Sequence, residues 1–524
     1  MQMTAELTKH ILYLINRGDF LAARDNCIQM LQKNPKNADG YFLLGITLLG
    51  IGNINKAVEL IHQAISLAPN NSEYLTQLAK SYVVLNDTLN AKKYADLALS
   101  LNPQSPITID TLGVVYSKLG LHEKAITLFS KAVSNNRNPS FLLNLAMSLK
   151  FIGDFGAARE AYESVIELAP HFYKAHSGLT SLGGISPDNN HIDRLTRQLK
   201  NAKSNAEYFH LCHAAAKEYE SLGDYETAFH YLKKGKQNRL AEIQYRFDDE
   251  EPPIFKALKA FFTQEIISLK SGFETEEPIF VVGMPRTGTT LVERIISNHA
   301  EVTTIGESHQ FGVQLKKLSR SKTNRVIDSA TIDGASSLDF SQLGAAYINS
   351  VRPQTGKTLH FVDKMPLNFL LIGFIVKALP NAKIICLRRN PLDTCTSNYR
   401  QLFSTHTPYY NYSYDLLSTA KYYLLFRDLM DFWQNLFPKN VYSVNYESLV
   451  NSPETQTKKL YDFLSLNWHA DMLDITQNTA PVATASAVQI REPINNRSVG
   501  SWKKYERHLS QVKQLLIKHQ IPFE

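Results

Sequence analysis

One spacing constrains the first half of this chain more than any other feature. Residues that accept a left-handed turn recur at intervals of 34 or 33 positions: Gly18, Gly52, Asn86, Gly120 and Gly153. Five positions after each of them comes a small side chain: Ala23, Ala57, Ala91, Ala125 and Ala158. A fixed period of this length indicates stacked copies of one helical unit, each too small to bury its apolar face alone.

Each unit predicts two helices joined by a tight turn. The glycine, or Asn86, makes the turn, and the alanine lets the second helix approach the first closely. Prolines then end the second helices, at Pro35, Pro69, Pro103 and Pro170. This pattern resembles the tetratricopeptide repeat over roughly residues 5–172, and a further unit, Ala206 to Lys236, repeats it with Gly223 and Ala228. Residues 181–205 break the period, and we expect a loop and a short helix there.

Two readings of the array remain open. The resemblance implies a concave groove that binds a peptide or a protein partner. The alternative is a scaffold that stiffens or dimerises the rest of the chain. Helical sequence continues past Lys236, and a helical connector over residues 254–270 is expected to lead into a different kind of fold.

The second half begins with a glycine loop in residues 278–299. We expect a buried strand from Ile279 to Val282, a loop from Gly283 to Gly288, and an amphipathic helix from Thr289. Free backbone N–H groups and the positive end of the helix dipole make such a loop an anion site. A P-loop has this spacing, but Thr289 stands where enzymes of nucleoside triphosphates carry lysine. We therefore expect a nucleotide without a γ-phosphate.

Apolar strand-like runs recur after the loop and alternate with helical stretches. They are Leu359–Val362, Lys383–Leu387 and Val441–Asn445, with a short run at Val302–Ile305. This rhythm predicts an α/β domain with a mainly parallel central sheet, whose ligands bind at the carboxyl ends of the strands.

Charged and polar residues follow each of these strands. Arg389 comes at the end of one strand, with Ser397 two turns into the next helix, and a guanidinium and a hydroxyl can together hold a second phosphate. Lys364 lies at the end of another strand, and Tyr446 follows the last. The tyrosine could cover a base or simply pack.

With the loop and the Arg389–Ser397 pair both in view, residues 278–510 resemble a sulfotransferase that uses 3′-phosphoadenosine 5′-phosphosulfate (PAPS). The resemblance assigns the 5′-phosphosulfate loop to Pro285, Arg286, Thr287, Gly288, Thr289 and Thr290, and the 3′-phosphate motif to Arg389 and Ser397. Sulfuryl transfer is an in-line displacement, so cations should surround the leaving oxygen, and Arg286 and Lys364 suit that role.

The acceptor hydroxyl needs a base, for which the resemblance favours Glu307. His309 is the rival, and His299 is more simply a helix cap. Glu307, Lys364 and the Ser486 segment are similar to the tyrosylprotein sulfotransferase type, so Ser486 is a candidate donor to the phosphosulfate.

Two arginines and one tyrosine-dense stretch remain to be interpreted. The resemblance places Arg497 in a late segment that closes over the 3′-phosphate. Arg388 reads as a structural cation beside Arg389. The tyrosine-dense stretch Thr407 to Tyr414 could line the acceptor site or form a packed aromatic loop.

Composition sets the remaining limits. The net charge of +7 is mild and gives no support to nucleic-acid binding. The four cysteines show no metal or disulfide spacing, which is typical of reduced thiols, and no metal is expected. We expect no signal peptide, and the sequence has no apolar run long enough to cross a membrane, so we expect a cytoplasmic protein.

We therefore predict three parts: a repeat array over residues 1–245, a helical connector over 246–275, and a sulfotransferase domain over 276–524. The predicted function is transfer of a sulfuryl group from PAPS to a hydroxyl, with protein tyrosine as the first candidate and the repeats recruiting the substrate or a partner. The alternatives are a carbohydrate, lipid or small-molecule acceptor with structural repeats, or a non-catalytic interaction protein. A P-loop kinase is disfavoured by Thr289. The oligomeric state cannot be read from the sequence.

Overall fold

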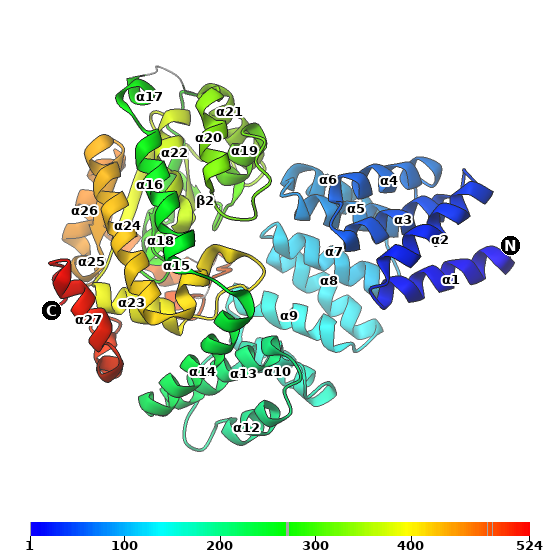
Figure 1. The fold of residues 1–524 in the computed structure, drawn as a ribbon, viewed down its shortest axis with the longest axis horizontal. Helices are drawn as coiled ribbons and strands as arrows, with labels where there is room; N and C mark the ends of the chain where they lie inside the picture. Colours follow the sequence, from blue (N-terminus) through cyan, green and yellow to red (C-terminus); the bar gives the residue numbers. More distant parts are fainter. Residues whose placement is uncertain (1, 269–271, 479, 485) are drawn as a thin grey trace. The chain divides into compact units, whose positions relative to one another are not determined.

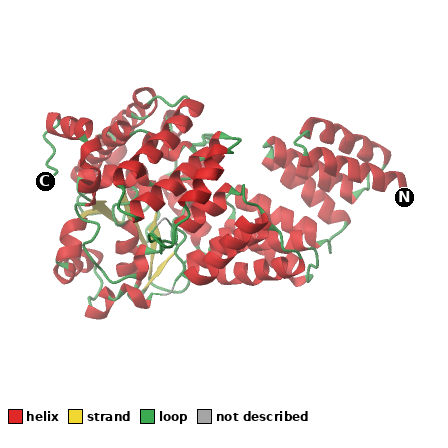
Figure 2. Cartoon of the chain, turned by 90° about the horizontal axis from the view of Figure 1, so that it is seen from below, coloured by secondary structure: helices red, strands yellow, loops and turns green. Residues whose placement is uncertain are grey.

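The computed structural model describes residues 2–268, 272–478, 480–484 and 486–524. It divides into two compact units, residues 1–165 and 166–524. Residues 269–271, which belong to the predicted connector, lie outside the described residues. Figures 1 and 2 show a first unit built of helices and a second unit in which helices surround a sheet.

Antiparallel helix pairs make up the first unit. Its helices are α1 (Gln2–Asn16), α2 (Phe20–Lys33), α3 (Ala38–Ile51), α4 (Ile54–Leu67), α5 (Ser72–Val84), α6 (Thr88–Ser100), α7 (Pro106–Lys118), α8 (His122–Asn135), α9 (Pro139–Ile152) and α10 (Phe155–Leu168), which runs past its end. The predicted turns are confirmed, because Gly18, Gly52, Asn86, Gly120 and Gly153 all have positive φ. The predicted small residues Ala23, Ala57, Ala91, Ala125 and Ala158 are fully buried, as close helix packing requires.

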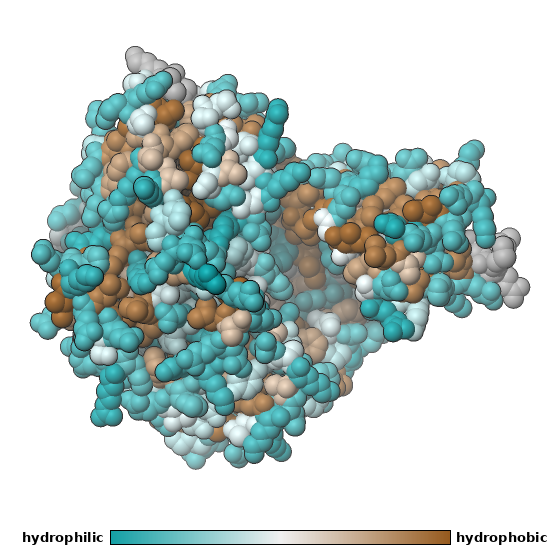
Figure 3. All heavy atoms as spheres, viewed as in Figure 1, coloured by the Kyte–Doolittle hydropathy of each residue, from teal (hydrophilic) through white to brown (hydrophobic). Residues whose placement is uncertain are grey.

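Apolar side chains also reach the surface of this unit. Figure 3 shows brown apolar atoms among hydrophilic ones over the repeat helices. Among the described residues, most large apolar side chains that are exposed lie between Leu12 and Met147, and Leu21 and Ile107 are the most exposed of them, at 63% and 65%.

The second unit begins with more helices. They are α11 (Tyr173–Thr180), α12 (Ile192–Lys200), α13 (Asn205–Ser221), α14 (Tyr225–Ile243), α15 (Phe247–Glu250), α16 (Pro252–Phe261) and α17 (Gln264–Ser268). The short helix expected within residues 181–205 is α12. Helices α13 and α14 form an antiparallel hairpin around the turn at Gly223, whose φ is +85°.

A five-stranded sheet forms the centre of the second unit. Its strands β1 (Pro278–Gly283), β2 (Val302–Thr304), β3 (His360–Lys364), β4 (Lys383–Arg388) and β5 (Val441–Asn445) are all parallel, in the order β2-β3-β1-β4-β5. The predicted strands are thus confirmed. Because the chain passes from β1 to strands on both sides of it, the carboxyl end of β1 is where a ligand of such a sheet binds.

Helices cover both faces of the sheet. They are α18 (Thr289–Ser297), α19 (Gln310–Leu318), α20 (Ser329–Gly334), α21 (Phe340–Val351), α22 (Ile372–Ala378), α23 (Pro391–Arg400), α24 (Leu416–Leu436), α25 (Tyr446–Asn451), α26 (Pro453–Leu464) and α27 (Ser510–Lys518), with 3-10 turns that include η3 (Pro408–Tyr414) and η7 (Ser501–His508).

Alternate residues of β1 enter two different cores. Phe280 and Val282 pack with Trp433, on the side of α24, whereas Ile279 and Val281 pack with Ile295, on the side of α18. A strand buried on both faces reads as a continuous apolar run, which is why β1 was visible in the sequence.

Candidate active site

The glycine loop connects β1 to α18. Arg286 has φ +67° and Gly288 has φ +104°, so two residues of this short turn adopt left-handed backbone. A Cβ on Gly288 would lie 2.5 Å from the ring of Tyr446, so a side chain there would collide with that ring. Gly288 is also the N-cap of α18 and has no side chain to bond the first-turn N–H groups. The loop therefore offers backbone donors to an anion.

Threonines line the loop and the start of α18. Thr287 donates from Oγ1 to the carbonyl oxygen of Met284 at 2.7 Å, which closes the loop on itself. Thr289 and Thr290 are both buried in the first turn of α18. These residues, with Pro285, lie at the carboxyl end of β1 as predicted.

Arg286 reaches from the loop to a distant part of the chain. Its guanidinium donates to Ser486 Oγ at 2.6 Å and to Gln489 Oε1 at 2.8 Å. Burial and then the neighbouring Arg389 lower the pKa of Arg286 to about 10, so it stays cationic at neutral pH. The structure brings Arg286 and Ser486 together, and Gln489 is a partner that the sequence did not suggest.

Arg389 lies beside Arg286, at the end of β4. It is 8% exposed and donates to the carbonyl oxygen of Arg286 at 3.0 Å and to that of Ser498, and its guanidinium lies 4.5 Å from the ring centre of Tyr446. Within the described part of the chain, its buried Nε has no hydrogen-bond partner. Two close guanidinium groups and one orphan donor fit a bound anion.

Helix α23 carries the rest of the predicted 3′-phosphate motif. Ser397 is half-buried on this helix. Its neighbour Asn398 donates to the carbonyl oxygens of Pro285, at 2.7 Å, and Thr394, at 2.9 Å. Asn398 thereby ties α23 to the glycine loop, a role that sequence reasoning missed although Asn398 adjoins a predicted residue.

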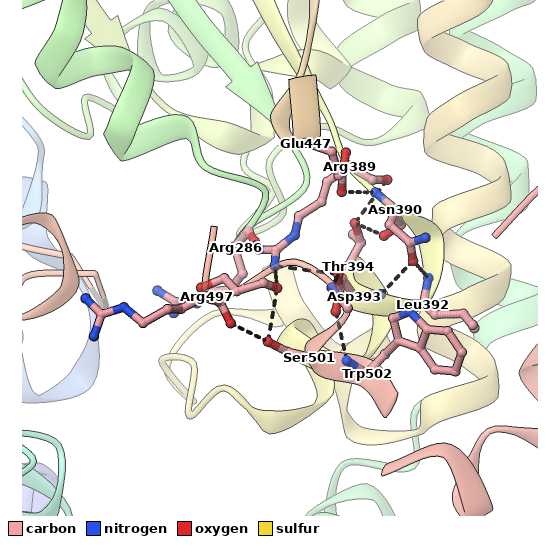
Figure 4. Close-up of polar contacts among 12 residues, drawn as sticks. Arg286, Arg389, Asn390, Leu392, Asp393, Thr394, Glu447, Arg497, Ser501 and Trp502 are labelled. Carbon is pink, nitrogen blue, oxygen red and sulfur yellow. Dashed lines mark hydrogen bonds and ion pairs between the residues drawn. The ribbon is translucent and has the colours of Figure 1, made fainter. Parts of the chain in front are cut away.

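Asp393, also on α23, holds a late segment of the chain. It accepts hydrogen bonds from the backbone N–H groups of Gly500, at 2.7 Å, and Trp502, at 2.8 Å, and lies 3.9 Å from Arg389 (Figure 4). This fixes the segment that begins at Ser498 over Arg389. Asp393 was also missed, because nothing local marks its distant partners.

Arg497 does not join the other site residues. Its guanidinium bonds Glu492 and Asn495 on the surface and points away from Arg286 and Arg389 (Figure 4). Its part in nucleotide binding stays a prediction. Arg388 donates to Asp431 at 2.7 Å and to Ser443 at 3.3 Å, which are contacts of a structural cation.

Lys364 and Glu307 meet at the rim of the sheet. The Nζ of Lys364 lies 2.6 Å from Glu307 Oε1 and 3.6 Å from Glu293 Oε2, and its side chain is fully buried. Burial alone would lower the pKa of Lys364, but the two carboxylates outweigh it and raise the pKa. Glu307 is 35% exposed at its side chain, so it faces solvent and can receive a substrate.

Two buried acids lie behind this pair. Glu293, on the inner face of α18, accepts a hydrogen bond from Thr304 Oγ1 at 2.6 Å. Asp363 is fully buried and accepts from the Tyr347 hydroxyl at 2.8 Å; burial, followed by the charge of Glu293, raises its pKa to about 8. Glu293 could have been suspected as a carboxylate on the apolar face of a helix.

The alternative bases are also placed. His309 is exposed at the start of α19, with its ring 6.0 Å from that of Tyr409. His299 is buried in the turn after α18 and accepts the backbone N–H of Glu301 at 3.1 Å through Nδ1. His299 therefore holds a turn, whereas His309 lies on the same rim as Glu307.

No group of three or more potential metal ligands occurs among the described residues. In the same residues, no helix is both long and apolar enough to span a bilayer.

The chain is similar to known protein families over both of its parts. Residues 278–470 match a family described as the sulfotransferase family, and tetratricopeptide repeat families match residues 14–80, 72–105, 110–139, 139–172 and 209–237. The sulfotransferase match includes Glu307, Lys364, Arg389 and Ser397 and ends before Ser486.

Three relatives illustrate the similarity. An uncharacterised protein of Aquifex aeolicus is 33% identical over 306 residues, which are 57% of this chain and 40% of that protein. A putative protein-tyrosine sulfotransferase of Caenorhabditis briggsae is 26% identical over 43% of this chain and 81% of its own length. Protein-tyrosine sulfotransferase A of Caenorhabditis elegans is 24% identical over 45% of this chain and 65% of its own length. The chain thus spans less than half of the Aquifex protein, and it joins N-terminal tetratricopeptide repeats to a C-terminal domain of the sulfotransferase family that is distantly similar to protein-tyrosine sulfotransferases.

Proposed function

We propose that this protein is a PAPS-dependent sulfotransferase that acts on a hydroxyl acceptor, with protein tyrosine as the first candidate. The observation that carries the proposal is the pairing of two sites on one sheet edge. An anion cradle, made by the glycine loop, Arg286 and Arg389, lies at the carboxyl ends of β1 and β4. A carboxylate–ammonium pair, Glu307 and Lys364, lies at the end of neighbouring β3.

The cradle fits the donor nucleotide. The backbone at Gly288 leaves no room for a side chain, and the buried Nε of Arg389 lacks a partner among the described residues. Arg389 and Ser397 would hold the 3′-phosphate, and the loop with Arg286 would hold the 5′-phosphosulfate. Tyr446, buried beneath Arg389, and Ser486, bonded to Arg286, are the further candidates for contact with the nucleotide, whereas Arg497 bonds Glu492 and Asn495 instead.

The chemistry divides among these residues. Bound PAPS supplies a sulfuryl group whose bond to the 5′-phosphate oxygen breaks as the acceptor oxygen bonds to sulfur, giving a sulfate ester and adenosine 3′,5′-bisphosphate. Glu307 would take the acceptor proton, and Lys364 and Arg286 would neutralise charge on the leaving oxygen. Glu293 and Glu307 keep Lys364 protonated, because they raise its pKa.

Two observations support a protein as the acceptor. Relatives named as protein-tyrosine sulfotransferases support a tyrosine acceptor, at identities of 26% and 24%. The exposed apolar side chains of the repeat helices support a protein partner there. We also propose a cytoplasmic location, because the spacing of the four cysteines is typical of reduced thiols.

The test incubates the full chain with labelled PAPS and, separately, tyrosine-containing peptides, carbohydrates and lipids. Transfer of label to at least one hydroxyl acceptor, and its loss in Arg389→Ala and Glu307→Ala, is the expected result. Calorimetry with adenosine 3′,5′-bisphosphate tests the donor site alone, and no binding by the wild-type protein would overturn the proposal.

A further inference from the structure

The hairpin α13–α14 belongs to the same unit as the sheet and packs on α23, the helix that carries Ser397. Ala216 and Leu232, one from each helix of the hairpin, are buried against Tyr399. Glu220 on α13 forms an ion pair with Arg400 at the end of α23. The hairpin coincides with the last match to the repeat family, residues 209–237. One repeat unit is thus joined to the candidate active site.

Lys236, on α14, is the most unusual residue of this contact. It is 2% exposed, and its Nζ donates to the carbonyl oxygens of Ser413, at 3.0 Å, and Gln401, at 3.4 Å. The Nζ also lies 5.2 Å and 5.3 Å from the ring centres of Tyr399 and Tyr414. Burial lowers its pKa to about 7, so burying this amine carries an energetic penalty that an apolar side chain would avoid.

A second cation of α14 contacts the same stretch of chain. Arg239 donates from Nη2 to the carbonyl oxygen of Thr405 at 3.2 Å. On α13, Phe209 packs edge-on against Tyr414 at 5.7 Å between ring centres. The hairpin therefore holds the segment 401–414, which we call the tyrosine loop, near its beginning, within it and at its end.

The other side of the tyrosine loop faces the proposed base. The Tyr409 ring lies 6.0 Å from that of His309, two residues after Glu307. Burial and then the charge of Glu307 raise the pKa of Tyr410, whose ring stacks on Phe403 at 4.2 Å. The loop also reaches the donor side, because the Tyr412 hydroxyl donates to Asn398 at 3.1 Å.

We propose that the α13–α14 hairpin positions the acceptor: Lys236 and Arg239 fix the tyrosine loop as the wall beside Glu307 against which the acceptor hydroxyl is aligned. The backbone carbonyls that these cations hold lie on the side of the loop that contacts the hairpin, and the half-buried rings of Tyr409 and Tyr410 lie toward the rim. Lys236 is a positioning residue, since it acts through the loop. The acceptor part of this inference rests on the proposed function, whereas the clamping of the loop does not.

The experiment compares the two clamp variants, Lys236→Met and Arg239→Met, with a control variant, Lys233→Met. Lys233 is an exposed lysine of the same helix. Hydrogen exchange of amides 401–414 reports the clamp. Steady-state kinetics with labelled PAPS and a tyrosine-containing peptide or 4-nitrophenol reports the acceptor, and calorimetry with adenosine 3′,5′-bisphosphate reports the donor site. We expect hydrogen exchange in residues 401–414 and the acceptor KM to rise about tenfold in both clamp variants, because backbone carbonyl oxygens of the loop lose their hydrogen-bond donors. The nucleotide Kd should change less than about threefold, and Lys233→Met should behave as wild type.

Two results would overturn the inference. One is an unchanged acceptor KM and unchanged exchange in the clamp variants of an active enzyme. The other is an equal loss of nucleotide affinity and kcat, which would indicate general disruption. Arg239 is only half-buried, so Arg239→Met still tests the clamp if Lys236→Met fails to fold. If the wild-type protein transfers no sulfuryl group at all, the proposed function fails. Hydrogen exchange still tests the clamp, because a rise confined to residues 401–414 in the clamp variants supports it and no rise refutes it.

Discussion

Replacing Glu307 by glutamine tests the assignment of the base most directly. Glutamine keeps the shape of the side chain and an oxygen that can accept from Lys364, but it cannot take a proton from the acceptor. Lys364 keeps a second carboxylate, Glu293, 3.6 Å away, so its ammonium stays paired. The substitution therefore separates proton transfer from the structure of the site.

Glu307→Gln should lower the transfer rate strongly and the stability of the fold only slightly. A positioned general base contributes about 10²–10⁴-fold, so the transfer rate should fall by that factor. A hydrogen bond between charged groups contributes about 1.5–3 kcal/mol. In Glu307→Gln the amide oxygen retains part of the hydrogen bond to Lys364, and the side chain of Glu307 is 35% exposed and screened by solvent. We therefore expect the free energy of unfolding to fall by about 1 kcal/mol.

Single-turnover transfer from labelled PAPS measures the rate. Thermal unfolding measures stability, and calorimetry with adenosine 3′,5′-bisphosphate measures nucleotide affinity. We expect a rate loss of about 100-fold or more, with nucleotide affinity within about threefold of wild type. His309→Gln is the matched control, because this exposed residue lies on the same rim. Glu307 is not the base if His309→Gln loses as much activity, or if Glu307→Gln keeps more than about a tenth of the wild-type rate.

Three further predictions concern the cradle and the acids behind it. Arg389→Lys should weaken adenosine 3′,5′-bisphosphate binding about 10–100-fold in calorimetry, because lysine lacks the planar fork and the face over Tyr446, whereas Arg388→Lys should bind as wild type. Gly288→Ala should weaken the same binding about tenfold or more, because the Cβ would meet the Tyr446 ring at a φ of +104°. Asp363→Asn should gain stability over wild type as pH rises. Burial raises the pKa of Asp363 from 3.8 to about 8, so between these values only the unfolded carboxyl has lost its proton, and wild-type stability falls with pH.

Each of these has a contrary outcome. Equal losses in Arg388→Lys and Arg389→Lys would mean that the second phosphate lies elsewhere. Normal binding by Gly288→Ala would show that the loop can shift without loss. Urea unfolding at pH 5 and pH 8 measures the free energy of unfolding of the wild type and of Asp363→Asn. The difference between the two proteins should change by on the order of a few kcal/mol between these pH values, and a difference that stays constant would contradict the prediction.

Much of the site could be predicted because its parts are local in sequence. The glycine loop needs only β1, Gly288 and the first turn of α18, which follow one another directly in the sequence, and the backbone alone builds it. Arg389 and Lys364 follow strands that are continuous apolar runs, and parallel strands bring their carboxyl ends to one edge. Spacing therefore gave both the residues and their approximate meeting place.

The partners of these residues could not be predicted in the same way. Glu293 is buried beside Lys364 only because α18 packs over β3. Asp393 and Asn398 bond backbone groups about 110 residues away, at Gly500, Trp502 and Pro285, and a backbone partner leaves no signature in the sequence. Arg497 looked equivalent to the other arginines, yet Glu492 and Asn495 hold its guanidinium on the surface.

Periodicity and apolar patterning, which are local properties, determined the repeat array, the strands and the anion loop of this protein. The domain limits at residues 245 and 275 stay a prediction. Tertiary packing alone decided which side chains surround Lys364, which segment lies over Arg389, and that the last repeat hairpin grips the tyrosine loop through Lys236. The two hydrogen bonds of Lys236 join residues 165 and 177 positions apart, and only the closed fold sets such a distance.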